Sequence, residues 1–114
     1  SGGIRPTEAL LSALATCTGM DVVSILRKKR QRITGFEVHA TGQRADEHPR
    51  RFLRIALDFV VRGVDVDPAA VERSIQLSHD KYCGVTASLN AEVVTSFRIE
   101  SEPALQLPAE RSPA

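Results

Sequence analysis

The two cysteines, Cys17 and Cys83, are the residues of this sequence best suited to covalent chemistry. Cys17 lies in a mostly apolar segment, so the competing interpretation is a small buried side chain without chemistry. Cys83 is predicted to lie where one helical segment ends and the next begins. The positive end of the second segment would lower the pKa of its thiol. Nucleophilic thiol chemistry is therefore the first hypothesis.

Other kinds of site find little support in the sequence. It contains none of the short motifs of serine hydrolases, phosphate-binding loops or dinucleotide sites. Two cysteines cannot complete a four-ligand zinc site, and the three histidines have no spacing that would supply the rest: His39, His48 and His79. We therefore expect no metal and no cofactor. The start, Ser1-Gly2-Gly3, carries no secretory signal, which predicts a reducing, cytoplasmic compartment where a purely structural disulfide is disfavoured.

Composition indicates one soluble globular domain. The chain has 114 residues, of which 42% are hydrophobic and 25% charged. No stretch approaches the roughly 20 apolar residues of a membrane span, so no membrane partner is expected. The net charge of +1 hides an excess of basic residues around Arg27 to Arg32. Such a run at a helix end suits the negative end of the helix dipole and needs no nucleic acid to explain it.

Residues 6–30 are predicted to form one long helix. Pro6 suits its first turn, and six residues fall on one stripe at helical spacing: Leu10, Leu11, Leu14, Thr18, Val22 and Ile25. Gly19 weakens the helix at its centre, and Asp21 is a candidate N-cap for a second segment after a kink. The helix is apolar over more of its circumference than a small sheet covers. It therefore needs further strands or a partner chain to bury it.

Three further segments alternate between apolar and polar residues as strands do: 33–45, 52–62 and 92–100. The first two are joined by a short polar turn, which predicts an antiparallel hairpin. In the second strand one set of residues is expected on the buried face: Leu53, Ile55, Leu57, Phe59 and Val61.

A second helical region follows the hairpin. Asp67 and Pro68 are a strong helix start, and they predict a helix over 68–82, followed by a short helix from residue 85. The order of elements predicts an α+β fold, with the helices on one face of an antiparallel sheet. This domain is expected to span residues 1–102, and residues 103–114 are expected to form a flexible tail.

Two segments resemble the cysteine motifs of the OsmC/Ohr superfamily. Residues 5–23, RPTEALLSALATCTGMDVV, resemble the first motif, a proline-led helix of small residues and leucines that runs into a cysteine. Residues 81–89, KYCGVTASL, resemble the second motif, and residues 42–49 resemble the hairpin of the OsmC-like branch. The resemblance covers residues 5–100 and keeps the predicted order of elements.

The resemblance implies a thiol-dependent hydroperoxide reductase. Cys17 would attack the peroxide and become a sulfenic acid, and Cys83 would resolve it as a Cys17–Cys83 disulfide. A dithiol reductant would then restore both thiols. The resemblance also implies an intertwined homodimer with each site at the subunit interface, which would bury the long helix.

Two features depart from the peroxidase members of the superfamily. Those members use an arginine from N-terminal strands, and because this chain is expected to start after such strands, no residue is assigned to that role. They also carry a glutamate ten residues before the attacking cysteine, where this sequence has Thr7. Glu8 lies about 100° further round the helix, and its simpler role is an acid in the first helical turn.

Two other function classes stay open. One is a redox-silent member that keeps the fold and binds a small hydrophobic ligand at the dimer interface. An ordinary pKa of Cys17 would favour that class, and a depressed pKa would favour catalysis. The other is a nucleic-acid-binding module that uses the basic run Arg27 to Arg32. It ranks last because no aromatic residues are interleaved there, and we expect no nucleic acid partner.

Overall fold

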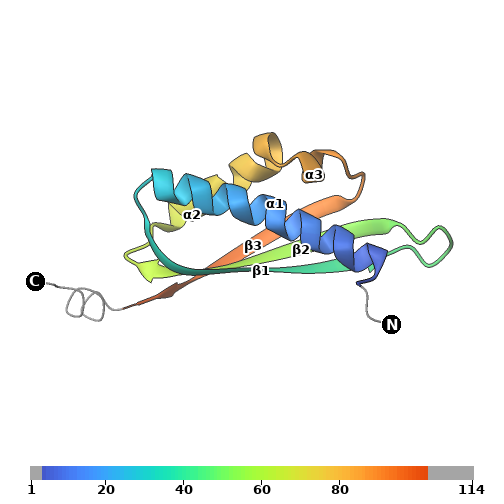
Figure 1. Ribbon diagram of the computed structural model, residues 1–114, viewed down its shortest axis with the longest axis horizontal. Helices are drawn as coiled ribbons and strands as arrows, with labels where there is room; N and C mark the ends of the chain where they lie inside the picture. The colour runs from blue at the N-terminus through green and yellow to red at the C-terminus, as the bar shows by residue number, and fades with distance from the viewer. Residues whose placement is uncertain (1–3, 103–114) are drawn as a thin grey trace, which may run out of the picture.

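The computed structural model describes residues 4–102 as helices packed on one face of a three-stranded sheet (Figure 1). In chain order the elements are α1 (Pro6–Lys28), β1 (Arg32–Arg44), β2 (Phe52–Val64), α2 (Pro68–Leu77), the π-helical turn η1 (Ser78–Tyr82), α3 (Gly84–Ala87) and β3 (Glu92–Ser101). The predicted α+β class is confirmed. The tail expected over 103–114 lies outside the described residues.

The sheet is mixed, with the strand order β1-β2-β3. β1 and β2 form the predicted antiparallel hairpin, with Phe36 opposite Val61. β3 runs parallel to β2, with Phe59 opposite Phe97. The expectation of an entirely antiparallel sheet is therefore wrong for the third strand. A helical crossover returns the chain to the end of the sheet where β2 began, and this makes the next strand parallel.

The central strand β2 supplies most of the sheet's share of the core. Ile55, Leu57, Phe59 and Val61 are buried with at most 1% of their surface exposed. Leu53 was expected among them but is 40% exposed, and Phe52 is buried instead. The strand pairing has a register shift between Gln43 and Arg44, and Arg44 pairs with Phe52 after it. Such an irregularity interrupts the two-residue alternation on which the prediction depended.

The helix α1 is continuous from Pro6 to Lys28, so the predicted second segment after Gly19 is wrong. Gly19 is buried, and a Cβ atom there would lie 3.3 Å from the Phe36 ring and 3.4 Å from a Val38 methyl group. The small residue thus lets β1 approach α1 closely. Asp21 lies in the middle of the helix and does not cap a second segment.

The apolar stripe of α1 is buried largely by this chain itself. Leu14, Val22 and Leu26 are fully buried in the core that the helices form with the sheet.

α1 is also long and apolar enough to cross a membrane, so the expectation that no segment meets that criterion is wrong. The finding is weak evidence for a membrane span, because the core helix of a sheet protein meets the same criterion.

Candidate functional site

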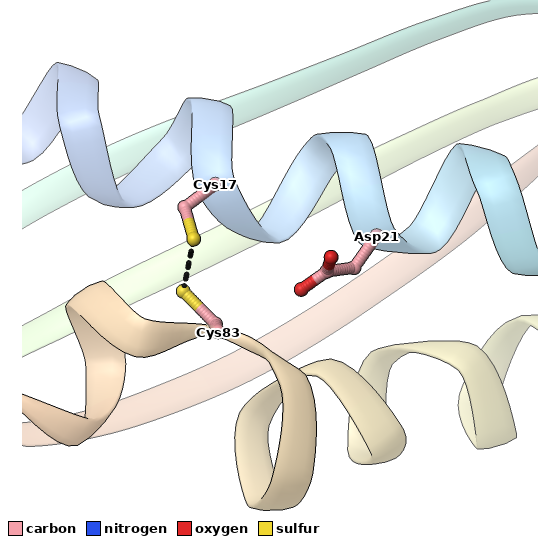
Figure 2. Close-up of side chains that lie close together, drawn as sticks. All are labelled: Cys17, Asp21 and Cys83. Atoms are coloured by element: carbon pink, nitrogen blue, oxygen red, sulfur yellow. Dashed lines mark hydrogen bonds between the residues drawn. The ribbon is translucent and has the colours of Figure 1, made fainter.

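Cys17 is held at the middle of α1 and is half-buried. The helix forms around it because alanine and leucine dominate the segment and Pro6 occupies the first turn. Glu8 accepts a hydrogen bond of 3.1 Å from the backbone N–H of Arg5, which satisfies one free donor at the helix start. Cys17 therefore sits on a rigid element and points toward the second helical region (Figure 2).

Cys83 lies at the junction between η1 and α3, as the sequence predicts. Its backbone is extended, with φ −83° and ψ 105°, and its N–H donates to the Ser78 carbonyl over 2.8 Å. The wider π-helical turn followed by this extended residue turns the side chain toward α1. Its sulfur accepts a hydrogen bond of 3.4 Å from the Thr86 N–H, so Cys83 is the N-cap of α3. Only 3% of Cys83 is exposed.

The two sulfur atoms lie 2.8 Å apart, and one thiol donates a hydrogen bond to the other (Figure 2). Both cysteines are free thiols. A disulfide bond is about 2.05 Å long, so the sulfurs need to move by less than about 1 Å to bond covalently. The fold thus brings together the two residues that the sequence singled out, across 66 positions of the chain.

The environments of the two thiols shift their pKa values in opposite directions. Burial raises the pKa of Cys17, and the hydrogen bond with Cys83 and the negative charge of Asp21 raise it further. Burial also opposes the thiolate of Cys83, but hydrogen bonds from Cys17 and Thr86 outweigh it and lower the pKa of Cys83. When the pair loses one proton, the charge therefore settles on Cys83, and Cys17 donates its remaining proton to it.

Asp21 is the member of the site that sequence reasoning missed. It follows Cys17 by one helical turn, so both side chains leave α1 on the same face. Its carboxylate accepts a hydrogen bond of 2.8 Å from the hydroxyl group of the buried Ser78. The ligand atoms of Cys17, Asp21 and Cys83 all lie within 4.8 Å of one another. The four-residue spacing was visible in the sequence, but the position of Ser78 was not.

The other residues considered from the sequence lie away from this site or do simpler work. Glu8 precedes Cys17 by nine residues, about 13 Å along the helix. His39 pairs with Glu37 on the sheet, and His79 pairs with Asp80 on η1. His48 lies in the turn between β1 and β2, and Tyr82 has 55% of its surface exposed.

An apolar groove of about 740 Å³ lies between α1 and β1. Its lining includes Met20, Val23, Phe36 and Val38, and neither cysteine contributes to it. Met20 is 69% exposed there and forms part of a contiguous apolar surface with the other lining residues. Arg27 and Lys28 also line the groove, so part of the basic run borders an apolar surface.

The chain is similar in sequence to a known protein family and to curated proteins. The model of the OsmC-like protein family matches residues 1–98. Protein YhfA of Escherichia coli strain K12 is 46% identical over 88 residues, which cover 77% of this chain and 66% of YhfA. The chain thus spans just under two thirds of the length of the curated relatives it matches.

Solved structures share the fold. A hypothetical protein from Aquifex aeolicus is 31% identical, with a TM-score of 0.85 over 90% of this chain and 79% of that one. An organic hydroperoxide resistance protein from Elizabethkingia anophelis is 15% identical, with a TM-score of 0.69 over 88% of this chain and 71% of that one. At the latter identity the likeness shows the fold alone.

Proposed function

The chain belongs to the OsmC-like protein family, and on that premise we propose that it reduces organic or hydrogen peroxides with the thiols of Cys17 and Cys83. The observation that carries the proposal is the 2.8 Å contact between the two sulfur atoms. Peroxides are the substrate class that the resemblance of both cysteine motifs to the OsmC/Ohr superfamily implies, and the family match over residues 1–98 supports that resemblance.

In the proposed reaction, one sulfur attacks the peroxide and the other resolves the product. The thiolate of Cys17 attacks an oxygen atom of the peroxide, the O–O bond breaks, and the departing alkoxide or hydroxide takes up a proton. The resulting sulfenic acid is attacked by the thiolate of Cys83, and the hydroxyl group leaves as water after protonation. A dithiol reductant then reduces the disulfide by exchange and is itself oxidised to a disulfide.

Access supports attack by Cys17, because Cys17 is half-buried whereas only 3% of Cys83 is exposed. The pKa directions favour the charge on Cys83, so Cys17 must first pass its proton to Cys83. The 2.8 Å contact makes that transfer direct. In the described residues, none of the groups that shift the pKa of Cys17 is a cation that would hold the charge there.

Single-cysteine variants test this order of attack. In Cys83→Ser, one equivalent of an organic hydroperoxide should leave a sulfenic acid on Cys17, which a dimedone-type probe labels. Cys17→Ser should consume no peroxide. Labelling of Cys83 in Cys17→Ser, with none of Cys17 in Cys83→Ser, would reverse the two roles.

The proposed active form is a homodimer in a reducing, cytoplasmic compartment. The apolar groove beside α1 and the exposed Met20 support the homodimer, because exposed apolar patches of this kind are uncommon on monomers and mark interfaces. A second copy of the chain is the occupant that the family resemblance implies. In a reducing compartment both thiols would be restored after each turnover, as the proposed reaction requires.

A redox-silent protein that binds a small hydrophobic ligand is the second candidate. The raised pKa of Cys17 favours it, because a protonated thiol is a poor nucleophile. The apolar groove beside α1 offers such a ligand space. Peroxide consumption separates the two functions: the redox-silent protein would leave a stoichiometric amount of hydroperoxide unreacted while still binding an apolar fluorescent probe.

A further inference from the structure

We propose that Cys17, Cys83 and Asp21 form a binding site for one Zn²⁺ ion. Their ligand atoms, two sulfurs and a carboxylate oxygen, lie within 4.8 Å of one another (Figure 2). The three residues come from two elements that are fixed against each other, the middle of α1 and the junction between η1 and α3. The cysteines and histidines alone do not complete a zinc site, and the carboxylate of Asp21 supplies the third ligand.

The donor set selects the class of metal. Thiolates favour soft or borderline ions such as zinc, whereas calcium and magnesium take six or more oxygen ligands. Three protein ligands with a fourth position open to water is the usual arrangement of an accessible zinc site. Cys17 and Asp21 are both half-buried and thus partly accessible to water, which would serve as the fourth ligand.

The site needs a small adjustment to receive the ion. Zinc–sulfur bonds of about 2.3 Å place two sulfurs of a tetrahedral site about 3.8 Å apart. The sulfurs must therefore separate by about 1 Å from their present 2.8 Å contact. A small rotation of the half-buried Cys17 side chain provides this, while Cys83 stays fixed by the Thr86 N–H.

Ser78 holds the carboxylate in a suitable orientation. Its hydroxyl group donates to Oδ2 of Asp21, and no other hydrogen bond to this carboxylate occurs among residues 4–102. Oδ1 is thus available as a ligand atom. Hydrogen bonds from neighbouring residues commonly orient metal-binding carboxylates in this way.

Zinc binding would also regulate the thiols. The ion replaces the two thiol protons, so one Zn²⁺ binds and two protons are released. Sulfur bound to zinc is withheld from peroxide, and a chain that already carries the Cys17–Cys83 disulfide has no thiolates to offer. The ion is therefore an inhibitor of peroxide reduction, a consequence that rests on the proposed function, whereas the binding itself does not.

Zinc titration of the reduced 114-residue chain against a chromophoric chelator tests the site. We expect one ion per chain, and a weaker affinity by at least about tenfold in Asp21→Ala and Asp21→Asn. Asp21→Asn keeps the size of the side chain and a group that accepts from Ser78, so a loss shared by both variants does not reflect unfolding. Each single cysteine-to-serine variant should lose tight binding.

Asp80→Asn is the matched control. Asp80 and His79 lie 2.9 Å apart on η1 and are surface donors close in sequence to Cys83, and Asp80→Asn should leave the affinity unchanged. With Co²⁺ in place of zinc, the wild type should show the strong visible bands of a tetrahedral site and thiolate-to-cobalt charge-transfer bands. Absence of binding, wild-type affinity in both Asp21 variants, or weakening by Asp80→Asn would overturn the proposal. None of these readings uses peroxide, so failure of the zinc site and failure of peroxide reduction are observed separately.

Discussion

The carboxylate of Asp21 accepts a 2.8 Å hydrogen bond from the hydroxyl group of Ser78, and this bond ties α1 to η1 beside the two thiols. Asp21 follows Cys17 by one turn, and Ser78 also accepts the backbone N–H of Cys83 at its carbonyl oxygen. A single pair of residues thus links the element that carries Cys17 to the element that carries Cys83. We expect the contact between the sulfurs to depend in part on this link.

Ser78→Ala should weaken the link between the two helical regions. Removing the hydroxyl leaves the half-buried Asp21 carboxylate without its partner, which costs about 1 kcal/mol in the free energy of unfolding. Disulfide formation should slow, because η1 is held less firmly against α1. Ser88→Ala is the control, since the hydroxyl group of Ser88, the C-cap of α3, donates to the Gly84 carbonyl of the same helix and does not reach α1. Denaturant unfolding of both variants measures the difference, and equal stabilities would contradict this role for Ser78.

Thiol alkylation should depend on pH in two steps. The pKa of Cys83 is lowered and that of Cys17 is raised, so one thiol should react with a midpoint below that of an ordinary cysteine and the other above it. Cys17→Ala removes a hydrogen bond that favours the Cys83 thiolate, while burial still opposes it. The midpoint of Cys83 should therefore move to higher pH in that variant. An unchanged midpoint in a pH series of iodoacetamide rates would show that Cys17 does not stabilise the Cys83 thiolate.

Met20→Glu should shift the chain from dimer to monomer without unfolding it. Met20 is 69% exposed in the groove beside α1, so a charge there disturbs a covering copy but not the core. Leu14 would be a poor test, because it is fully buried within the chain itself. Met20→Leu keeps the apolar surface and should stay dimeric. Sedimentation velocity distinguishes the monomeric from the dimeric variant. A monomeric wild type at micromolar concentration would contradict the proposed homodimer.

Gly63→Ala should destabilise the fold. A Cβ atom at Gly63 would clash with the carbonyl oxygen of Arg32 and lie 2.7 Å from a Val66 methyl group. Backbone cannot move aside as a flexible side chain does, so we expect a loss of about 1–3 kcal/mol. Gly84→Ala is the matched control, because nothing lies within 4 Å of its added methyl group. Thermal unfolding that ranks the two variants equally would refute this close packing of β1 on β2.

The sequence predicted the elements better than their arrangement. Proline and aspartate at helix starts and two-residue alternation in strands placed α1, β1, β2, α2 and β3 within a few residues of their observed bounds. The parallel direction of β3 was missed because alternation does not encode strand direction. The continuity of α1 through Gly19 was missed because close packing against Phe36, a tertiary contact, outweighs the local weakness of glycine.

The same distinction holds for the site. Cys17 and Cys83 could be selected from their residue type and local context. Asp21 could not, because its role depends on Ser78, which lies 57 positions away along the chain. The opposite pKa directions of the two thiols likewise arise from contacts across elements, namely from burial and from the hydrogen bond between Cys17 and Cys83.

The most direct test of the central claim is the mass of the reduced chain after one equivalent of an organic hydroperoxide, followed by peptide mapping without reduction. We expect a mass lower by two hydrogens, one peroxide consumed per chain, and a cross-linked peptide pair that joins Cys17 to Cys83 within one chain. Two unmodified thiols, or a disulfide that joins two chains, would contradict it.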